Sequence, residues 1–345
     1  MGCTVVVGGQ YGSEGKGKVV GLLAGRMAEP VVVRCGGPNS GHTTRARGGE
    51  VVLRQVPAAA GHPTALLMLG AGCVVDVDVL VAEAQKLGVA RERLVVDPRA
   101  VVVTDADRAA ELNTAKEIGS TSSGTGAALI RRMGRIGQIP LAGDSEKLRD
   151  LVRVEPVAPL LHRCLERGGD VIVEGTQGFG LSLLHGFNYP FVTARDTSAS
   201  AFASEVGLSP RAIDSVTMVI RTFPIRVGGN SGPFPQEITW EVVRDESCAP
   251  ETMPEYTSVT RRLRRVARFD VSAVVTACQY NAPTSLAVMG MDRIDYRDGS
   301  AKSESDLTER SQTFLSLLRR ETRVPIEWIG TGFGSLDAFR IELGA

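Results

Sequence analysis

Residues 4–19 read TVVVGGQYGSEGKGKV, and this stretch decides the fold. The three valines at positions 5–7 are typical of a buried strand, and the lysine-containing segment from Gly17 onward predicts a helix. A glycine-rich turn joins the two. Such a strand, loop and helix can bind anions, because glycines let backbone N–H groups approach phosphate oxygens and the helix N-terminus adds partial positive charge. The stretch therefore predicts an α/β fold with a nucleotide loop like that of P-loop NTPases.

The loop matches the P-loop pattern only in part. Its core, GSEGKGK at residues 12–18, satisfies G-x4-G-K, but Val19 stands where the pattern has a serine or threonine for magnesium. Lys16 and Lys18 add positive charge at alternate positions. A P-loop ATPase unrelated to purines is disfavoured by Val19 and by the lack of a recognisable Walker-B strand ending in aspartate.

Short β-branched runs bounded by glycine alternate with helical stretches along the chain. Strands are predicted at residues 4–7, 31–34, 51–53, 94–96, 171–173, 215–220 and 271–276, and helices at 17–28, 76–87, 145–167 and 308–321. Pro156 and Pro159 are expected to split the third helix. Short apolar strands of this kind predict a mostly parallel central sheet covered on both faces. We expect residues 1–345 to form a single elaborated domain, with 228–235 and 249–254 as mobile loops.

Composition and charge narrow the class of protein. Hydrophobic residues make up 43% and charged residues 23%, which permits a large core. Lysine plus arginine and aspartate plus glutamate both number 39, and this zero balance argues against nucleic acid as a partner. No apolar run approaches a membrane span and no export leader is evident, so we expect a soluble, cytoplasmic protein without a membrane partner. Six widely spaced cysteines predict reduced thiols: Cys3, Cys35, Cys73, Cys164, Cys248 and Cys278.

A second glycine-rich loop, RCGGPNSGHTT at residues 34–44, directly follows the strand predicted at 31–34. Asn39, Thr43 and Thr44 offer neutral hydrogen bonds there. His42 can act as a proton donor or stabilise developing charge near pH 7. A lone histidine is more often structural, so the residues leave both roles open for His42.

Seven segments together resemble the adenylosuccinate synthetase family, in family order: residues 8–18, 36–43, 118–126, 173–178, 185–193, 226–234 and 257–265. Enzymes of that family join L-aspartate to the 6-position of a purine monophosphate. A nucleoside triphosphate first phosphorylates the 6-oxygen, and the aspartate amine then displaces phosphate. The resemblance implies Mg2+ as cofactor and small-molecule substrates.

The resemblance also implies residue roles. His42 is implied as the acid near the β–γ bridge of the triphosphate, with Lys16 and Ser13 also catalytic, and Ser13 and Gly41 as metal ligands. The triphosphate-binding residues that it implies are Gly12, Glu14, Gly15, Lys16, Gly17, Lys18, Gly41, His42, Thr43, Gln279 and Gly332. Those for the purine monophosphate are Ser13, Asn39, Ser120, Thr121, Arg135, Gln177 and Thr193. Arg135 matches an arginine that reaches a nucleotide in the neighbouring subunit, which implies a homodimer with shared sites.

The segment at residues 259–265 resembles the loop of that family that binds aspartate. The resemblance places Val259, Thr260, Arg262 and Arg264 on this substrate. Arginine forks bind carboxylates bidentately, which suits a dicarboxylate. Arg261 replaces a glycine that is usual in the family.

One departure concerns the purine. Ser13 stands where the family has an aspartate that removes the proton from N1 of the purine and contacts magnesium. The departure leaves three interpretations: an inactive homologue, a nearby replacement base such as Glu14, or a different purine. A guanine carries a 2-amino donor next to N1, and replacing Asp with Ser opens space and offers a hydroxyl acceptor there. A phage branch of the family, in which this serine occurs, acts on dGMP. We therefore expect dGMP as the substrate, in the host cytoplasm if the chain is phage-encoded.

A second departure concerns the phosphate donor. The strand predicted at residues 271–276 leads into Ala277, Cys278 and Gln279, where the family has a lysine, a leucine and an aspartate that binds the guanine of GTP. An amide suits the edge of adenine better than that of guanine. Gln279 therefore predicts ATP or dATP as the donor.

Two rival interpretations stay open at this stage. One is an ordinary adenylosuccinate synthetase that uses IMP and GTP and tolerates Ser13. The other is a nucleotide-binding regulator that kept the pocket and lost catalysis.

Overall fold

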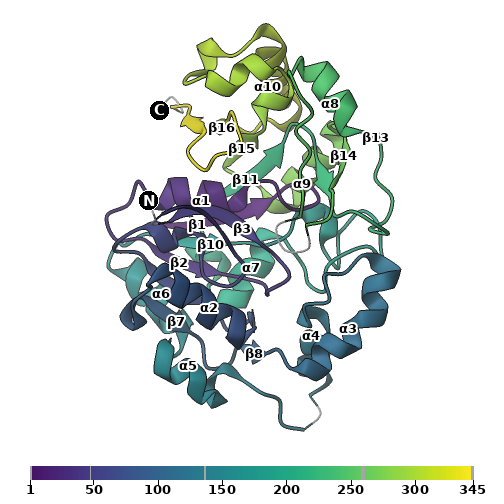
Figure 1. The fold of residues 1–345 in the computed structure, drawn as a ribbon. Helices are drawn as coiled ribbons and strands as arrows, with labels where there is room; N and C mark the ends of the chain where they lie inside the picture. The colour runs from purple at the N-terminus through teal and green to yellow at the C-terminus, as the bar shows by residue number, and fades with distance from the viewer. Residues whose placement is uncertain (1, 47, 136, 258–260, 343–345) are drawn as a thin grey trace.

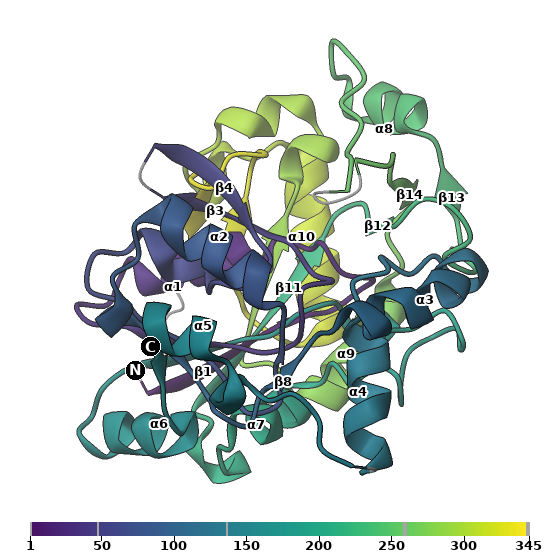
Figure 2. The same cartoon turned by 60° about the horizontal axis from the view of Figure 1, so that its bottom comes forward.

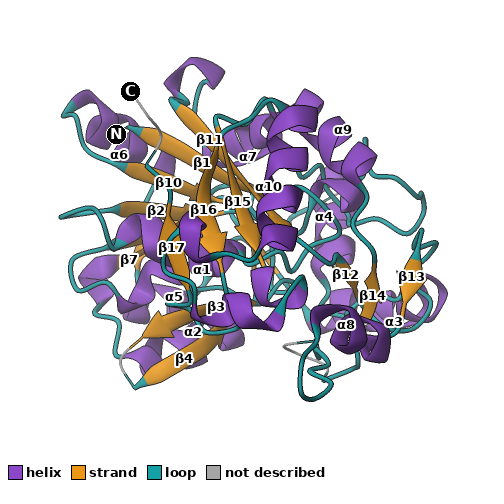
Figure 3. Ribbon diagram, turned by 90° about the horizontal axis from the view of Figure 1, so that it is seen from above, coloured by secondary structure: helices purple, strands orange, loops and turns teal. Residues whose placement is uncertain are grey.

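The computed structural model describes residues 2–46, 48–135, 137–257 and 261–342. Its centre is a ten-stranded sheet in the order β17-β16-β15-β11-β1-β10-β2-β5-β7-β9 (Figure 3). All neighbouring strands in it pair in parallel except β16 and β17. The strands are β1 (Cys3–Gly8), β2 (Val31–Arg34), β5 (Leu66–Leu69), β7 (Leu94–Val96), β9 (Arg153–Val154), β10 (Val171–Glu174), β11 (Ser215–Arg221), β15 (Ser285–Met289), β16 (Ile326–Gly330) and β17 (Ala338–Arg340).

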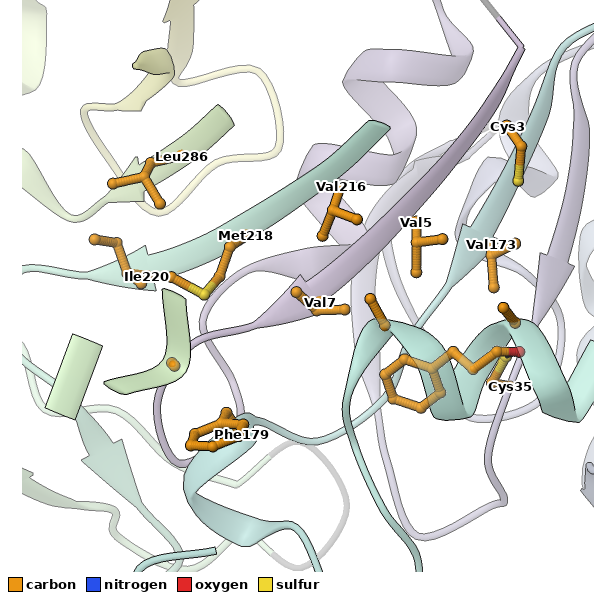
Figure 4. Close-up of a cluster of buried hydrophobic side chains, with 14 of the residues drawn as sticks. Cys3, Val5, Val7, Cys35, Val173, Phe179, Val216, Met218, Ile220 and Leu286 are labelled. Atoms are coloured by element: carbon orange, nitrogen blue, oxygen red, sulfur yellow. The ribbon is translucent and has the colours of Figure 1, made fainter. Parts of the chain in front are cut away.

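Helices cover both faces of the sheet, and the alternation of side chains along each strand assigns residues to the two cores. On β1, Val5 and Val7 belong to one hydrophobic cluster and Val6 to the other. Figure 4 shows part of the first cluster, in which Val5, Val173 and Met218 come from neighbouring strands. Residues of α6 (Val157–Glu166), α7 (Ala199–Val206), α9 (Val271–Asn281) and α10 (Glu309–Thr322) complete the first cluster. Residues of α1 (Lys16–Ala24), α2 (Val77–Leu87) and α5 (Glu146–Leu151) complete the second.

Smaller elements surround this three-layer centre. The helices α3 (Asp105–Ile118) and α4 (Thr125–Gly134) pack together at one side of the molecule (Figures 1 and 2). A hairpin is formed by β3 (His42–Ala46) and β4 (Gly49–Leu53), and a short pair by β6 (Val74–Val75) and β8 (Val101–Val102). A three-stranded sheet of β12 (Ile225–Arg226), β14 (Arg265–Ala267) and β13 (Glu237–Ile238) packs with α8 (Trp240–Ser247).

The structure confirms the expected α/β class and most of the predicted elements. The run at 145–167 is split as expected, since α5 ends at Leu151 and α6 begins at Val157, after Pro156. The run at 51–53 is a strand, but it lies in the β3–β4 hairpin instead of the central sheet. Among the described residues, no helix is long and apolar enough to cross a membrane.

The strand predicted at residues 271–276 is wrong, because this segment is the start of helix α9. Asp270 caps that helix by accepting hydrogen bonds from the backbone N–H groups of Ser272 and Ala273, at 2.9 and 3.2 Å. The buried residues Val274, Ala277, Cys278 and Asn281 follow helical spacing. Capping and this spacing outweigh the strand preference of the valines. The strand of the central sheet in this region is instead β15 (Ser285–Met289).

Candidate active site

A pocket lies at the carboxyl ends of the central parallel strands, where α/β folds bind their ligands. Its walls are formed by residues 11–18 after β1, 39–43 after β2, 177 and 181 after β10, 221 at the end of β11, and 289, 290, 292 and 293 at the end of β15. Residues 255–257, 332, 333 and 335 also line it. The pocket thus joins both predicted loops.

The phosphate loop has the backbone that its glycines predict. Gly12 and Gly15 have φ angles of 86° and 106°, and Gly15 is the N-cap of α1. Ser13 between them also takes a left-handed φ of 58°, which is uncommon for a residue other than glycine. The side chain of Ser13 is exposed and lines the pocket.

Glu14 faces inward within this loop. One carboxylate oxygen accepts hydrogen bonds from the backbone N–H groups of Gln10 (3.2 Å) and Gly12 (2.8 Å), and the other lies 2.6 Å from Lys16 Nζ. Both oxygens of this buried carboxylate are therefore used inside the loop. This arrangement argues against Glu14 as the replacement base and indicates that it holds the loop and Lys16.

Both lysines are buried and line the pocket. Lys16 Nζ also donates to the carbonyl of Gln177, and Lys18 Nζ donates to the carbonyls of Gly332 (3.2 Å) and Asp337 (2.8 Å). An ammonium has three N–H donors, so each of these contact sets leaves donor capacity for a phosphate. Burial lowers the pKa of Lys18 to about 8, partly opposed by Asp337, so this side chain is still mostly charged at pH 7.

His42 begins strand β3 and is held by a buried carboxylate. Its Nδ1–H donates to Glu174 Oε1 at 2.5 Å. Glu174, at the end of β10, also accepts hydrogen bonds from Arg34 Nη1 (2.9 Å) and from the backbone N–H of Ala58 (2.8 Å). His42 Nε2 is buried and has no hydrogen-bond partner among the described residues. Since His42 lines the pocket, this nitrogen is the one available to a ligand.

The charges around His42 set its protonation. Burial, followed by the positive charge of Arg34, lowers the pKa of His42 to about 4, and the hydrogen bond that His42 donates to Glu174 opposes this shift. The imidazole is therefore neutral at pH 7, with its proton on Nδ1. The implied role as an acid requires a second proton on Nε2, and a polyphosphate beside it would favour that proton.

The two implied metal ligands could supply only a small part of the coordination of a magnesium ion. Ser13 and Gly41 both line the pocket and offer neutral oxygens. Among the described residues there is no cluster of three or more histidine, cysteine, aspartate or glutamate side chains that could hold a metal. These residues therefore suit Mg2+ that takes most of its ligands from phosphates and water.

Of the residues implied for the purine monophosphate, Asn39, Thr121 and Gln177 line the pocket together with Ser13. Ser120 and Thr193 lie outside its described lining. The backbone N–H of Thr193 donates to the carbonyl of Leu181, a lining residue. Ser120 directly precedes Thr121.

Arg135 lies away from the pocket in its own chain. It is exposed and caps the C-terminus of α4 with a left-handed φ of 51°.

Of the residues implied for aspartate, Arg264 lines the pocket. Its backbone N–H donates to the carbonyl of Glu255 (2.8 Å), and its Nε donates to the carbonyl of Tyr256 (3.2 Å). Burial lowers the pKa of Arg264 to about 10, so it keeps its charge at neutral pH. Arg262 is exposed and is not among the lining residues, while Val259 and Thr260 fall outside the described residues.

Gln279 was assigned to the phosphate donor because a strand was predicted at residues 271–276, and that strand is absent. Gln279 is exposed on helix α9 and is not among the described residues that line the pocket. A carboxylate that does line the pocket is that of Asp292, which follows β15. Burial raises the pKa of Asp292, and Arg293 Nε lies 3.5 Å from its carboxylate. The error arose because the strand was placed one element too early.

With this geometry described, the chain can be compared with known proteins. A model of the adenylosuccinate synthetase family matches residues 5–150 and 140–299. The chain belongs to this family. Its members are ligases that form C–N bonds, so the chain is an enzyme of that class. The adenylosuccinate synthetase of Methanocaldococcus jannaschii is 38% identical over 337 residues, which cover 96% of this chain and 94% of that protein. The adenylosuccinate synthetase of Archaeoglobus fulgidus is 36% identical over 338 residues, which cover 96% of each.

Two solved structures of similar proteins share the fold. Fully ligated adenylosuccinate synthetase from Plasmodium falciparum superposes with a TM-score of 0.86 at 20% identity, covering 98% of this chain and 99% of that one. The succinoaminodeoxyadenylate synthetase PurZ of cyanophage S-2L, bound to dGMP and dATP as an energy donor, superposes with a TM-score of 0.82 at 29% identity, covering 98% and 95%.

The carboxylate–histidine contact yields a prediction about pH. In Glu174→Gln, the hydrogen bond and charge that raise the pKa of His42 are lost or weakened, so that pKa falls below about 4. Because the acid role needs the doubly protonated imidazole, we expect the maximal rate of aspartate-dependent phosphate release to fall roughly 10- to 100-fold at pH 7 and its optimum to move to lower pH.

The matched control is Asp298→Asn. Asp298 is also a fully buried carboxylate, bonded to Thr308 and Ser311, and lies outside the pocket lining. A pH–rate profile of Glu174→Gln that equals the wild-type profile would remove Glu174 from the control of His42.

Proposed function

We propose that the chain joins the amine of L-aspartate to C6 of a purine nucleoside monophosphate, with hydrolysis of a nucleoside triphosphate and Mg2+ as cofactor. The observation that carries the proposal is the convergence of three kinds of group on one pocket. These are the ammonium groups of Lys16 and Lys18, the imidazole of His42 and the guanidinium of Arg264. The ammonium groups suit phosphates, the imidazole suits the charge that develops during phosphoryl transfer, and the guanidinium suits a dicarboxylate.

The residues would divide the two chemical steps. In the first step, Lys16, Lys18 and the loop N–H groups hold the triphosphate while its terminal phosphoryl group passes to the 6-oxygen of the purine. His42 lies where it can stabilise the charge that develops between them. In the second step, Arg264 holds aspartate so that its amine attacks C6 and phosphate departs with the 6-oxygen. Mg2+ would neutralise charge on the phosphates beside Ser13 and Gly41.

For the identity of the purine, the sequence comparisons favour IMP with GTP as donor. The archaeal relatives that are 35–38% identical over nearly the whole chain are named adenylosuccinate synthetases. Asp292 lines the pocket, and burial raises its pKa; in its ionised form this carboxylate can accept hydrogen bonds from N1–H and N2–H of guanine. Asp292 also raises the pKa of Lys18, the lysine that we assign to the triphosphate.

One observation favours a second candidate, dGMP with ATP or dATP as donor. Ser13 exposes a short hydroxyl in the pocket where a carboxylate would serve hypoxanthine. The pocket carboxylates of Glu14 and Glu255 are both engaged by cations. A hydroxyl can accept a hydrogen bond from a 2-amino group, and the S-2L enzyme with the shared fold was solved with dGMP and dATP.

A competition assay separates the two candidates. The purified chain is given aspartate, Mg2+ and either IMP with GTP or dGMP with ATP or dATP, and the succinyl product is measured by mass.

If dGMP is the substrate, Ser13→Asp should lower kcat/KM for dGMP at least tenfold, because a carboxylate crowds the 2-amino group. If IMP is the substrate, Ser13→Asp should raise kcat/KM for IMP by supplying a base. Ser13→Ala is the control for loss of the hydroxyl alone. An unchanged purine preference in Ser13→Asp would show that Ser13 does not select the base.

Arg264→Ala should raise the KM for aspartate at least tenfold while the KM values of both nucleotides change less than threefold, because a bidentate carboxylate contact is lost. Arg297→Ala removes an exposed arginine that pairs with Asp295 outside the pocket lining and serves as the control. Equal increases in all three KM values would contradict the assignment of Arg264 to aspartate.

We further propose that two copies of the chain share their sites, with Arg135 reaching the purine nucleotide of the partner. The exposed apolar side chains of Leu112 on α3 and of Ile130 and Met133 on α4 support this, since α4 ends at Arg135 and exposed apolar surface suits an interface. Sedimentation should give a dimer. Mixing Arg135→Ala with an inactive His42→Ala chain should restore part of the activity, because one site of the mixed dimer has both residues. A monomer that is fully active would overturn the proposal.

A further inference from the structure

Arg221 is the last residue of β11 and lies between the phosphate loop and Arg264. Its backbone is held twice by the side chain of Gln10. Arg221 N–H donates to Gln10 Oε1 (2.8 Å), and Gln10 Nε2 donates to the carbonyl of Arg221 (3.0 Å). The strand end is thereby fixed to the residue where the phosphate loop begins.

The guanidinium of Arg221 then reaches in two directions. Its Nη1 donates to the carbonyl of Ser13 (3.1 Å) and to Glu255 Oε2 (3.0 Å), and its Nη2 donates to Glu255 Oε1. The carbonyl of Glu255 accepts the backbone N–H of Arg264. One side chain thus connects Ser13 with the segment that carries Arg264.

The ion pair in this connection is largely buried, which strengthens it. The side chains of Arg221 and Glu255 are 14% and 11% exposed, so neither ion is screened by water as a surface pair would be. A planar guanidinium fixes both contacts at once, whereas an ammonium could satisfy only a point contact. Ser13 needs such support, because its left-handed backbone is otherwise unfavourable for a residue with a side chain.

We propose that Arg221 is a positioning residue that sets the distance between the purine side of the pocket, at Ser13, and the aspartate side, at Arg264, through Glu255. The inference rests on the proposed function, in which these two sides hold the two molecules that are joined. Holding both reactants in register accelerates a bond-forming step by fixing their separation. Arg221 therefore acts on kcat and on the KM for aspartate together.

The experiment compares Arg221→Met, Arg221→Lys, Glu255→Gln and the double variant Arg221→Met/Glu255→Gln in the full chain. We expect Arg221→Met to lower kcat at least tenfold and raise the KM for aspartate at least fivefold. The double variant should lose no more than Arg221→Met alone, because both changes break one connection. Arg221→Lys should recover the KM for aspartate through the ion pair with Glu255 while kcat stays low. If the fold-loss in kcat of the double variant equalled the product of the losses in the two single variants, the proposal would be overturned.

A second readout does not need the reaction. Arg261 and Arg262 are exposed, so trypsin can cleave beside them. We expect a purine monophosphate, with IMP and dGMP as the probes, to slow this cleavage in the wild-type chain and to lose that effect in Arg221→Met and Glu255→Gln. Retained protection in both variants would sink the inference. If the wild-type chain forms no succinyl product from either purine, the proposed function fails, and the cleavage result alone judges Arg221.

Arg319→Met is the matched control for folding. Arg319 makes a two-contact pair with Glu304 at the surface, outside the pocket lining. It should leave kcat, the KM for aspartate and the cleavage pattern unchanged. Melting temperatures of all variants show whether Arg221→Met acts through stability. Arg221 would be merely structural if the melting temperature of Arg221→Met fell much further than that of Arg319→Met and if the KM values for aspartate and for the purine monophosphate rose equally.

Discussion

The carboxylate of Glu174 is the constraint on which both the fold and the pocket depend. A fully buried carboxylate is stable only with close partners, and removing one partner of a buried ion pair costs about 3–5 kcal/mol. Its partners come from β2, β3 and the short helix at Ala58–Gly61, through Arg34, His42 and the N–H of Ala58. The sheet, the hairpin and this helix therefore have to assemble together, and the same contacts orient His42. Stability and catalytic geometry rest on a single group.

Two other cations of the pocket are also paired with carboxylates before any ligand binds. Glu14 neutralises Lys16, and Glu255 neutralises Arg221. This internal balance explains how a chain of zero net charge can concentrate cations at one edge of its sheet without destabilising it. It also means that phosphates entering the pocket compete with protein carboxylates for the same cations. Lys18 and Arg264 differ, since their side chains donate to backbone carbonyls and keep their positive charge for a ligand.

Sequence patterns predicted the parts of this molecule that are local. The strand at 31–34, the helix split after Leu151 and the glycine turn at 12–15 follow from hydrophobic runs, proline and glycine. The helix that begins at Val271 was misread because its valines prefer strands, while the cap at Asp270 and the spacing of buried residues decide otherwise. That one error put Gln279 at a strand end, whereas the strand β15 is the one that leads to a lining residue, Asp292. Contacts such as Arg221 with Ser13, 208 positions apart, leave no local signal.

Overall sequence identity reports on the shared fold and family, whereas the choice of purine depends on a few residues that contact the base. Identity of 38% is an average over 337 residues, most of which build the sheet, the cores and the phosphate cradle that any purine would use. A base is distinguished by one or two buried donors and acceptors, and leaving such a group unpaired can change selectivity by roughly 10⁴-fold. We propose that Ser13 acts in this way once a purine covers its exposed hydroxyl, since it lines the pocket and its backbone is held by Arg221. A relative of lower identity can therefore share the substrate, because the residue that selects the base contributes almost nothing to the average.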